Sequence, residues 1–400
     1  AVAPAAGPLP ANLHLLHSWG GGLERWVRLF AAADRRSRNL VLSSHGTRDA
    51  YGLELVLWDA ASALELGRWV LSEAICEVAV RNAEYLALLA SLVTEHRLAH
   101  LYVSSLIGHA VDALDLGLPT TVVHHDFFPF CPALNLYFGA TCQSCGAGEL
   151  TACLAANPYS ELFRENPPEH WLDLRERSLA LLASRGTTHV CPRPWVRDAF
   201  HRIDGRFAAL PWTVVEHGID GEPVDCFGGA EPGRRLRLLH LGRLNRYKGL
   251  DRLRKLLPEL CRRAELTLLG TGPAGEELAG FPGVEVIEEY RPEELTALLR
   301  RLRPDLALFL SVVPETYCFT LSEAFLRGIP AVARRLGALA ERIEPGRSGL
   351  LFDTDEECLE HLATLDRTRP HLQSMSRHLR SLSPRTAGEM VADYYRLRGE

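Results

Sequence analysis

Residues 306–330 of the chain read LALFLSVVPETYCFTLSEAFLRGIP. The run Leu306–Leu310 has the length and composition of a buried strand, VVPE forms a loop, and TLSEAFLRG predicts a helix that ends at glycine. This order of strand, loop and helix is one unit of a parallel α/β sheet. Ligands of such sheets bind outside the carboxyl ends of the strands, so we expect chemistry in the loop that carries Glu315.

The same order repeats along the chain, and we therefore predict parallel sheets covered by helices. In the second half, helices are expected up to about Arg263 and over Pro292–Leu302, and strands at Leu236–Leu241, Leu266–Leu269, Val284–Ile287, Ala331–Val332 and Gly349–Phe352. In the first half, strands are expected at Leu13–His17, Leu40–Ser43, Leu53–Trp58, Leu101–Ser104 and Thr120–His124.

The chain has 400 residues, enough for two domains. A stretch rich in Gly and Pro at residues 205–222 precedes a new series of strands and helices, so we place the boundary there. The predicted domains cover residues 13–212 and 213–385. Residues 1–12 are interpreted as a linker or the boundary of a fragment of a longer protein, because AVAPAAGPLP has no signal-peptide pattern. We expect residues 386–400 to form a final helix.

The composition excludes several classes of protein. Lys plus Arg is 44 and Asp plus Glu is 50, a net charge of −6, which disfavours a nucleic-acid binder. The hydrophobic content of 47% disfavours disorder, and no run reaches the roughly 18 apolar residues of a membrane span. Ten cysteines in this length do not indicate a disulfide scaffold, so we expect a reduced, cytoplasmic setting.

Two glutamates are the first candidate site residues. Glu315 lies in the loop after a buried strand, and Glu323 follows eight positions later, inside the helix. A carboxylate accepts two hydrogen bonds and suits a vicinal diol such as a ribose, and amides at a helix start suit an anionic or hydroxyl-rich ligand. The alternative is that both glutamates are solvated residues flanking the helix.

The second candidate is GRLNRYKG at residues 242–249. Gly242 allows close approach to a ligand, Arg243 offers a planar fork to phosphate oxygens, and Lys248 adds a compact charge. Together they would stabilise a departing pyrophosphate, although a polar turn with two surface cations is the alternative. The order of residues differs from a Walker loop, which argues against a P-loop ATPase.

These stretches occur with several others in an order that makes a resemblance specific. The chain resembles the retaining GT-B glycosyltransferases of family 4. Its sequence around Glu315 is similar to that of bacterial enzymes that build surface polysaccharides such as O-antigen. The resemblance implies two Rossmann-like domains that face each other across a cleft, with the final helix crossing back to the first. The matching stretches are GGGLE (20–24), HHD (124–126), EHGID (216–220), GRLNRYKG (242–249), GTGP (270–273), PETYCFTLSEAFLRGIPAV (314–332) and LGALAERI (336–343).

The resemblance also implies a role for each matched residue. Arg243 and Lys248 would hold the donor diphosphate, Glu315 the hydroxyls of the donor sugar, and Glu323 the ribose. His125 would lie beside the donor sugar at the reacting face, with His124 as the second candidate. Backbone groups near the donor would come from Gly20, Gly21, Gly22, Gly242, Gly270, Tyr317, Cys318, Phe319 and Thr320.

The implied reaction moves a hexosyl or deoxyhexosyl group from a nucleotide-diphosphate sugar to a glycan or lipid-linked acceptor. Substitution occurs on the front face with retention, and the leaving phosphate helps to remove the acceptor proton. No catalytic metal is expected, because Asp353-Thr354-Asp355 follows a strand and is interpreted as a helix N-cap rather than a metal-binding DxD motif. The sequence departs from the family pattern at Cys318, usually Gly or Ser, and at His217, often Asn.

Four cysteines crowd one stretch as C-x10-C-x2-C-x7-C. A structural zinc, a disulfide, or a set of small apolar residues would each explain them. The four are Cys131, Cys142, Cys145 and Cys153.

The arginines of a helix expected over Gly22–Arg38 allow two interpretations. They could rest on anionic lipid at the inner membrane face, or they could form a solvated surface. Two further functions are considered beside the transferase. One is a sugar-nucleotide 2-epimerase, and the other is a catalytically silent nucleotide-sugar-binding domain of a larger protein.

Overall fold

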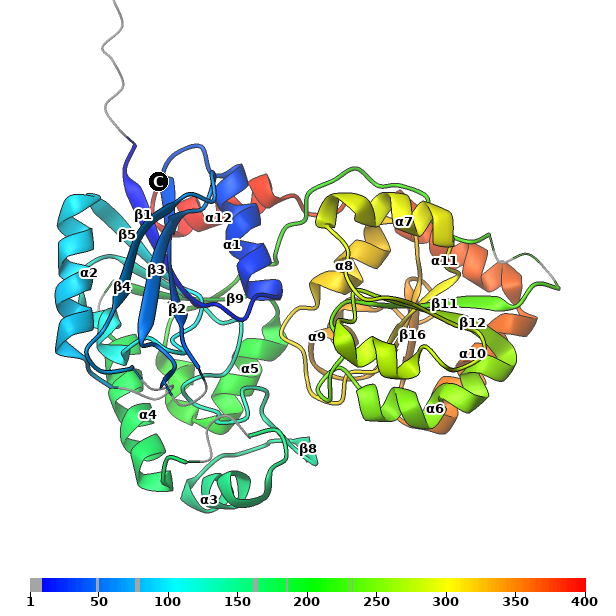
Figure 1. Cartoon of the computed structure of the whole chain (residues 1–400), viewed down its shortest axis with the longest axis horizontal. Helices are drawn as coiled ribbons and strands as arrows, with labels where there is room; N and C mark the ends of the chain where they lie inside the picture. The colour runs from blue at the N-terminus through cyan, green and yellow to red at the C-terminus, as the bar shows by residue number, and fades with distance from the viewer. Residues whose placement is uncertain are drawn as a thin grey trace, which may run out of the picture. The chain divides into compact units, whose positions relative to one another are not determined.

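The computed structural model describes residues 9–47, 50–75, 80–160, 165–184, 186–229, 231 and 233–400. The chain divides into two compact units, which are described one at a time (Figure 1). Unit 1 comprises Ala1–Gly218 and Arg385–Glu400, and unit 2 comprises Ile219–Pro384. Residues 1–8 of the predicted linker lie outside the described residues.

Unit 1 is built on an eight-stranded sheet in the order β10-β9-β6-β5-β1-β2-β3-β4. The central strand β1 (Ala11–His17) is buried along its whole length, as expected of a parallel strand covered on both faces. It begins at Ala11, so Ala11 and Asn12 are strand and not linker. The other strands that run parallel in this sheet are β2 (Arg38–His45), β5 (Leu98–Val103), β6 (Thr120–Val123), β9 (Thr187–Cys191) and β10 (Trp212–Val214).

The prediction of a wholly parallel sheet is wrong at one edge of unit 1. Strand β3 (Glu54–Asp59) pairs antiparallel with β2, and β4 (Glu65–Val70) pairs antiparallel with β3. The turn at residues 60–64 is too short for the crossover that parallel strands need, so it can only join a hairpin. The predicted domain boundary at 212/213 is also wrong, because it would cut β10, whose short apolar run pairs with β9.

Helix α1 (Gly22–Ala33) follows β1 and buries the apolar face formed by Trp26, Phe30 and their neighbours. It ends at Ala33, earlier than predicted, because Arg38 already begins β2. The last helix, α12 (Ala387–Leu397), belongs to unit 1 and packs on α1, with Tyr394 against Trp26. The remaining elements are α2 (Ala83–Glu95), η2 (Val111–Asp115), β7 (Tyr137–Phe138), β8 (Ala140–Thr141), α3 (Ala147–Ala156), α4 (Pro168–Leu182), α5 (Pro194–Ile203) and η4 (Gly205–Ala209).

Unit 2 has a six-stranded sheet in the order β13-β12-β11-β14-β15-β16, and every pair in it is parallel. The predictions for β11, β13 and β16 are confirmed residue by residue. The strands are β11 (Leu236–Leu241), β12 (Ala264–Leu269), β13 (Val284–Ile287), β14 (Leu306–Phe309), β15 (Ala331–Arg334) and β16 (Gly349–Phe352).

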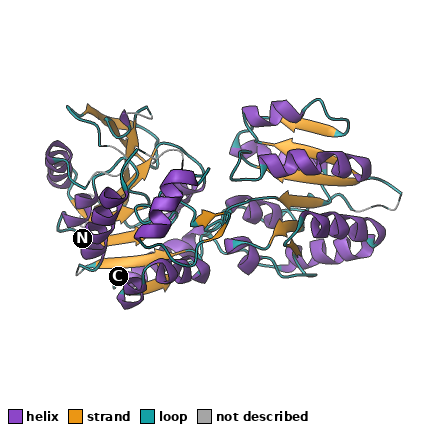
Figure 2. Cartoon of the chain, turned by 90° about the horizontal axis from the view of Figure 1, so that it is seen from below, coloured by secondary structure: helices purple, strands orange, loops and turns teal. Residues whose placement is uncertain are grey.

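Helices cover both faces of this sheet (Figure 2). Alternate residues of a strand point to opposite faces of the sheet and so pack in two different cores. Leu238 packs in one core and Leu239 in the other. The first core contains residues of α6 (Leu250–Arg263), α10 (Asp355–Arg367) and α11 (Arg369–Ser381). The second contains residues of α7 (Leu295–Leu302), α8 (Phe319–Leu326) and α9 (Gly337–Arg342), and η5 (Pro273–Leu278) and η6 (Pro292–Glu294) complete the unit.

Two sequence interpretations are tested by the helices. Thr354 caps α10 by accepting a hydrogen bond from the Glu357 amide at 3.2 Å, which confirms Asp353-Thr354-Asp355 as an N-cap. Among the residues that the structure describes, no helix is both long enough and apolar enough to cross a membrane.

Candidate active site

Three loops meet at the carboxyl edge of the unit 2 sheet. They follow β11, β12 and β14, which are neighbours in the order of strands. The amides of Gly242 and Leu244 donate to the carbonyls of Leu269 and Thr271, at 2.8 and 3.1 Å. These hydrogen bonds tie the GRLNRYKG loop to the GTGP turn, so two of the predicted motifs become one surface.

The third loop carries Glu315 to the same place. Lys248 Nζ lies 2.7 Å from Glu315 Oε2, and the amide of Val312 donates to the Tyr247 carbonyl at 2.9 Å. The Lys248 side chain is 39% exposed and that of Glu315 only 10%, so the pair opens to solvent on the lysine side. Ser311 donates its hydroxyl proton to Glu315 Oε1. Ser311 is not among the predicted site residues, since a serine after a strand is an ordinary turn residue.

The ion pair sets the charge state of both groups. Burial alone would lower the pKa of Lys248, but the Glu315 carboxylate raises it above its ordinary value. Burial would likewise raise the pKa of Glu315, and Lys248 lowers it overall. His240, at the end of β11, is buried beside this pair, and burial lowers its pKa to about 4. Lys248 therefore stays cationic, Glu315 anionic and His240 neutral around pH 7.

Glycines let the backbone and Arg243 approach each other closely. A Cβ at Gly272, whose φ is +64°, would lie 2.4 Å from Arg243 Nη1. A Cβ at Gly242, whose φ is +101°, would lie 2.9 Å from Thr320 Cγ2. The guanidinium of Arg243 thus lies next to the GTGP turn. The Arg243 side chain is exposed at the carboxyl ends of the strands.

Helix α8 begins directly after the Glu315 loop. Its N-cap is Cys318, with φ of 72° in the left-handed region, where a glycine is the more usual residue. Burial raises the pKa of the Cys318 thiol to about 12, so the group stays protonated. Tyr317, Cys318, Phe319 and Thr320 therefore lie where the chain turns into α8, and the first amides of the helix face this edge.

Glu323 is buried on α8, with only 3% of its surface exposed. Its carboxylate pairs with Arg327, one turn later, and Arg327 Nη2 also donates to Thr296 Oγ1 at 3.0 Å. Arg327 is not among the predicted site residues, although its spacing of four residues from a helical glutamate is the signal that would have found it.

In unit 1, the glycine loop follows β1 and the histidine pair follows β6, and β5 lies between these two strands in the sheet. Gly20 and Gly21 have φ of 74° and 84°, and Gly22 is the first residue of α1. The ring of His125, just after β6, lies 5.2 Å from Trp26 and 5.0 Å from His217. Burial lowers the pKa of His125 to about 3, so its imidazole is neutral above acidic pH.

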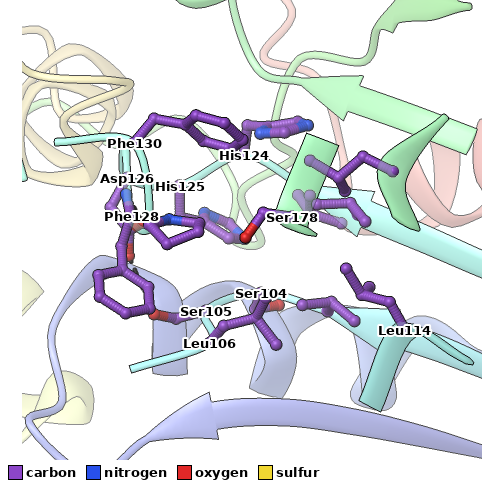
Figure 3. A pocket seen from close by; sticks show the side chains of 15 residues that line it. Ser104, Ser105, Leu106, Leu114, His124, His125, Asp126, Phe128, Phe130 and Ser178 are labelled. Atoms are coloured by element: carbon purple, nitrogen blue, oxygen red, sulfur yellow. Dashed lines mark hydrogen bonds between the residues drawn. The ribbon is translucent and has the colours of Figure 1, made fainter. Parts of the chain in front are cut away.

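His124 and His125 contact different aromatic neighbours. His124 stacks on His189, to which it is hydrogen-bonded at 3.2 Å, and it packs against Phe200 in the core. Both histidines line a small cavity of about 30 Å³ with Ser104, Ser105 and Asp126 (Figure 3).

Asp126 links the two loops that line this cavity. It accepts hydrogen bonds from the Ser105 hydroxyl at 3.0 Å and from the Phe128 amide at 2.9 Å. Burial raises its pKa to about 6. The predicted site residues are therefore divided between the units: Gly20 to Gly22 and His125 lie in unit 1, and Arg243, Lys248, Glu315 and Glu323 lie in unit 2.

The predicted zinc site is not formed. The four cysteines carry free thiols close enough to influence one another, but the described residues contain no group of three or more His, Cys, Asp or Glu side chains arranged to hold a metal ion. Three of the sulfurs have other partners: the Leu136 amide donates to Cys131, Asn157 to Cys153, and the buried Arg175 to Cys145 at 3.1 Å.

Known proteins match this chain in sequence and in fold. Residues 235–365, which contain the three loops, match the family model described as Glycosyl transferases group 1. A glycogen synthase of Thermus thermophilus is 27% identical over 387 residues, covering 88% of this chain and 84% of that protein.

Solved structures match both units. Anabaena HepE in complex with UDP has a TM-score of 0.61 at 15% identity, covering 97% of this chain and 99% of HepE. Sucrose-phosphate synthase from Thermosynechococcus elongatus has a TM-score of 0.65 at 13% identity, covering 97% of this chain and 98% of that one. The chain is a glycosyltransferase with the GT-B fold. The predictions of enzyme class and fold class are confirmed.

Proposed function

We propose that this glycosyltransferase moves a hexosyl or deoxyhexosyl group from a nucleotide-diphosphate sugar to a glycan or lipid-linked acceptor, with retention at the anomeric carbon. The observation that carries the proposal is the Lys248–Glu315 pair at 2.7 Å, at the edge of the sheet where three loops meet. A cation and an anion at one point suit a ligand with a charged phosphate next to a hydroxyl-bearing sugar.

Each charged group has a part in this reaction. Lys248 and Arg243 neutralise the diphosphate, which makes it a better leaving group. Glu315 accepts hydrogen bonds from hydroxyls of the donor sugar, and the Arg327-bound carboxylate of Glu323 takes the ribose. The neutral imidazole of His125 hydrogen-bonds the donor sugar without adding charge near the reacting carbon.

The bond changes balance without a protein base. The bond from the anomeric carbon to the phosphate oxygen breaks, and a bond from that carbon to the acceptor oxygen forms on the same face. The proton of the acceptor hydroxyl passes to the departing phosphate oxygen. The products are the glycosylated acceptor and a nucleoside diphosphate.

We propose UDP-glucose as the first donor to test, because HepE, which shares this fold, has been solved with UDP-glucose. The test is release of nucleoside diphosphate from a panel of nucleotide sugars, with thermal shift to detect binding. A ligand at 100 times its Kd adds about 2.7 kcal/mol, which is readily measured.

The panel also separates the competing candidates. A 2-epimerase would interconvert two nucleotide sugars in the absence of any acceptor, and a silent binding domain would show a thermal shift without turnover. Slow release of nucleoside diphosphate, accelerated by an acceptor, is the expected result. Absence of both binding and release across the panel would overturn the proposed function.

We further propose that the acceptor belongs to a bacterial surface polysaccharide such as O-antigen, and that the enzyme works in the cytoplasm, at the inner membrane face when its acceptor is lipid-linked. The arginines of the α1 region already have protein partners: Arg28 pairs with Glu24 at 2.7 Å and Arg36 lies 4.8 Å from the Tyr395 ring. Flotation with anionic liposomes at low salt tests whether these arginines contact the membrane. Absence of binding would favour the interpretation that they form a solvated surface.

A further inference from the structure

One short helix braces the loop that carries Glu315. Helix α9 follows β15, and its first residues hold the main chain of Glu315: the Ala338 amide donates to the Glu315 carbonyl at 2.8 Å. Gly337 has φ of +54°, and a Cβ there would lie 2.7 Å from the same carbonyl oxygen. The N-terminal end of α9 is thus in direct contact with the backbone of a predicted donor-site residue.

The other end of α9 holds the continuation of that loop through one side chain. Arg342 Nη1 donates to the carbonyls of Tyr317 and Cys318, at 2.7 and 2.8 Å. Its Nη2 donates to the Ser322 hydroxyl at 2.7 Å, and its guanidinium lies 3.9 Å from the centre of the Tyr317 ring. A single guanidinium therefore joins the last two residues before α8 to the first turn of that helix.

These contacts decide which way the loop amides point. In a planar trans peptide the C=O and the following N–H point in opposite directions. Because the carbonyls of Tyr317 and Cys318 point to Arg342, the amides of Cys318 and Phe319 point away from it. Those are two of the backbone donors expected to contact the donor sugar and its phosphate.

One residue of the loop has an unfavourable backbone conformation that other contacts must stabilise. Cys318 is held at φ of 72°, a conformation that costs a residue with a side chain more than it costs glycine. The two charge-assisted hydrogen bonds from Arg342 hold the carbonyls on either side of that position.

We propose that Arg342 is a positioning residue of the donor site, which aims the Cys318 and Phe319 amides at the bound nucleotide sugar. This inference rests on the proposed function, and it adds a residue that contacts the backbone of the site and not the reacting atoms. The sequence offers no local signal for it, because Arg342 follows the loop by more than twenty residues.

The test compares Arg342→Met and Arg342→Lys with Arg347→Met. Arg347 is a matched control: it is exposed, it lies just after α9, and its partner is Glu344 at 2.6 Å. Methionine keeps the length of the side chain and removes the donors, whereas lysine keeps the charge but cannot form the fork. For each variant the measurements are donor KM, acceptor KM, kcat, Kd for UDP and the melting temperature.

We expect Arg342→Met to raise donor KM and the Kd for UDP by about 10-fold or more and to lower kcat, with acceptor KM unchanged, since misplaced site groups cost rate steeply. Arg342→Lys should recover part of the loss, and Arg347→Met should match the wild type. A purely structural role would lower the melting temperature and change donor and acceptor KM together.

Two outcomes would overturn the proposal separately from the proposed function. If the wild type binds a nucleotide sugar and Arg342→Met behaves like Arg347→Met, Arg342 positions nothing. If Arg342→Met does not fold, Ser322→Ala serves in its place, because it removes one hydrogen-bond partner of the Arg342 guanidinium. An unchanged donor KM in both Ser322→Ala and Arg342→Lys would then overturn the proposal that Arg342 positions the loop. A wild type that binds no nucleotide sugar overturns the proposed function itself, and this inference with it.

Discussion

Lys248 Nζ and Glu315 Oε2 are 2.7 Å apart, although they belong to loops that follow two different strands, β11 and β14. The two strands are neighbours in the sheet, so their carboxyl ends bring the loops together. Under the proposed function, a donor diphosphate that enters this edge would meet a lysine already held beside the carboxylate that we assign to the sugar.

Replacing Lys248 by alanine should therefore reduce turnover. The loss of one preorganised group that stabilises developing charge costs roughly 10²–10³ in kcat. Steady-state kinetics of Lys248→Ala measure this, with Lys255→Ala as the control, because Lys255 is exposed and pairs with Asp355 at 2.8 Å on α10. An unchanged kcat with only a weaker KM would show that Lys248 binds the donor without stabilising the leaving group.

Removing Arg327 should destabilise the fold. Arg327→Met leaves Glu323 as a buried carboxylate without its helical cation, and breaking such a pair costs about 3–5 kcal/mol. Urea unfolding measures the change. The double variant Glu323→Gln with Arg327→Met should be more stable than Arg327→Met alone, since no buried charge remains. Equal stability of the two would contradict the idea that Arg327 neutralises the Glu323 carboxylate.

Glycine should be favoured over alanine at position 318. Cys318→Ala keeps a side chain at φ of 72°, whereas Cys318→Gly relieves it, so the glycine variant should be more stable than the alanine variant by roughly 1–2 kcal/mol. At Cys261, inside helix α6, the order should reverse, with alanine better by about 1 kcal/mol. Denaturant melts of the four variants give the comparison, and the same order at both positions would refute the backbone explanation.

Stability should depend on pH through Asp126. Burial raises its pKa to about 6 from an ordinary value of 3.8. The native state then binds the proton more tightly than the unfolded state does. The resulting stabilisation is complete below about pH 3.8 and is lost as pH rises through about 6.

Asp126→Asn removes the buried charge and still accepts from the Phe128 amide. The variant should gain on the wild type as pH rises from 4 to 8, by on the order of 1 to 3 kcal/mol. Urea unfolding at several pH values measures the difference. Ser62→Ala, on an exposed turn, is a suitable control, and a difference between variant and wild type that does not change with pH would contradict the raised pKa.

Much of the fold of unit 2 could be predicted from the sequence. Strand β14, LALF, is a short and continuous apolar run that is buried along its whole length, because both faces of a parallel sheet are covered. The edge strand β4 was missed, since ELGRWV is largely exposed and lacks that signal. The direction of β3 was also missed, because a strand pattern contains no information about its neighbour.

The candidate site divides in the same way. The sequence predicted Lys248 and Glu315 from residue type and motif, but not that they pair, and it missed Ser311, Arg327 and Arg342. For the four cysteines, close spacing along the chain left a zinc site, a disulfide and small apolar residues as alternatives, and in the structure three of their sulfurs are hydrogen-bonded to other groups.

The sequence by itself determined the α/β class, the helix N-cap at Thr354 and the motif residues at the strand ends, because short-range patterns of apolar residues, glycines and charges act within one element and its loop. Only the tertiary structure decided which charged groups became partners and which way the loop amides point. Those contacts join residues such as Cys318 and Arg342, which are distant in sequence and meet only when the sheet has brought their elements together.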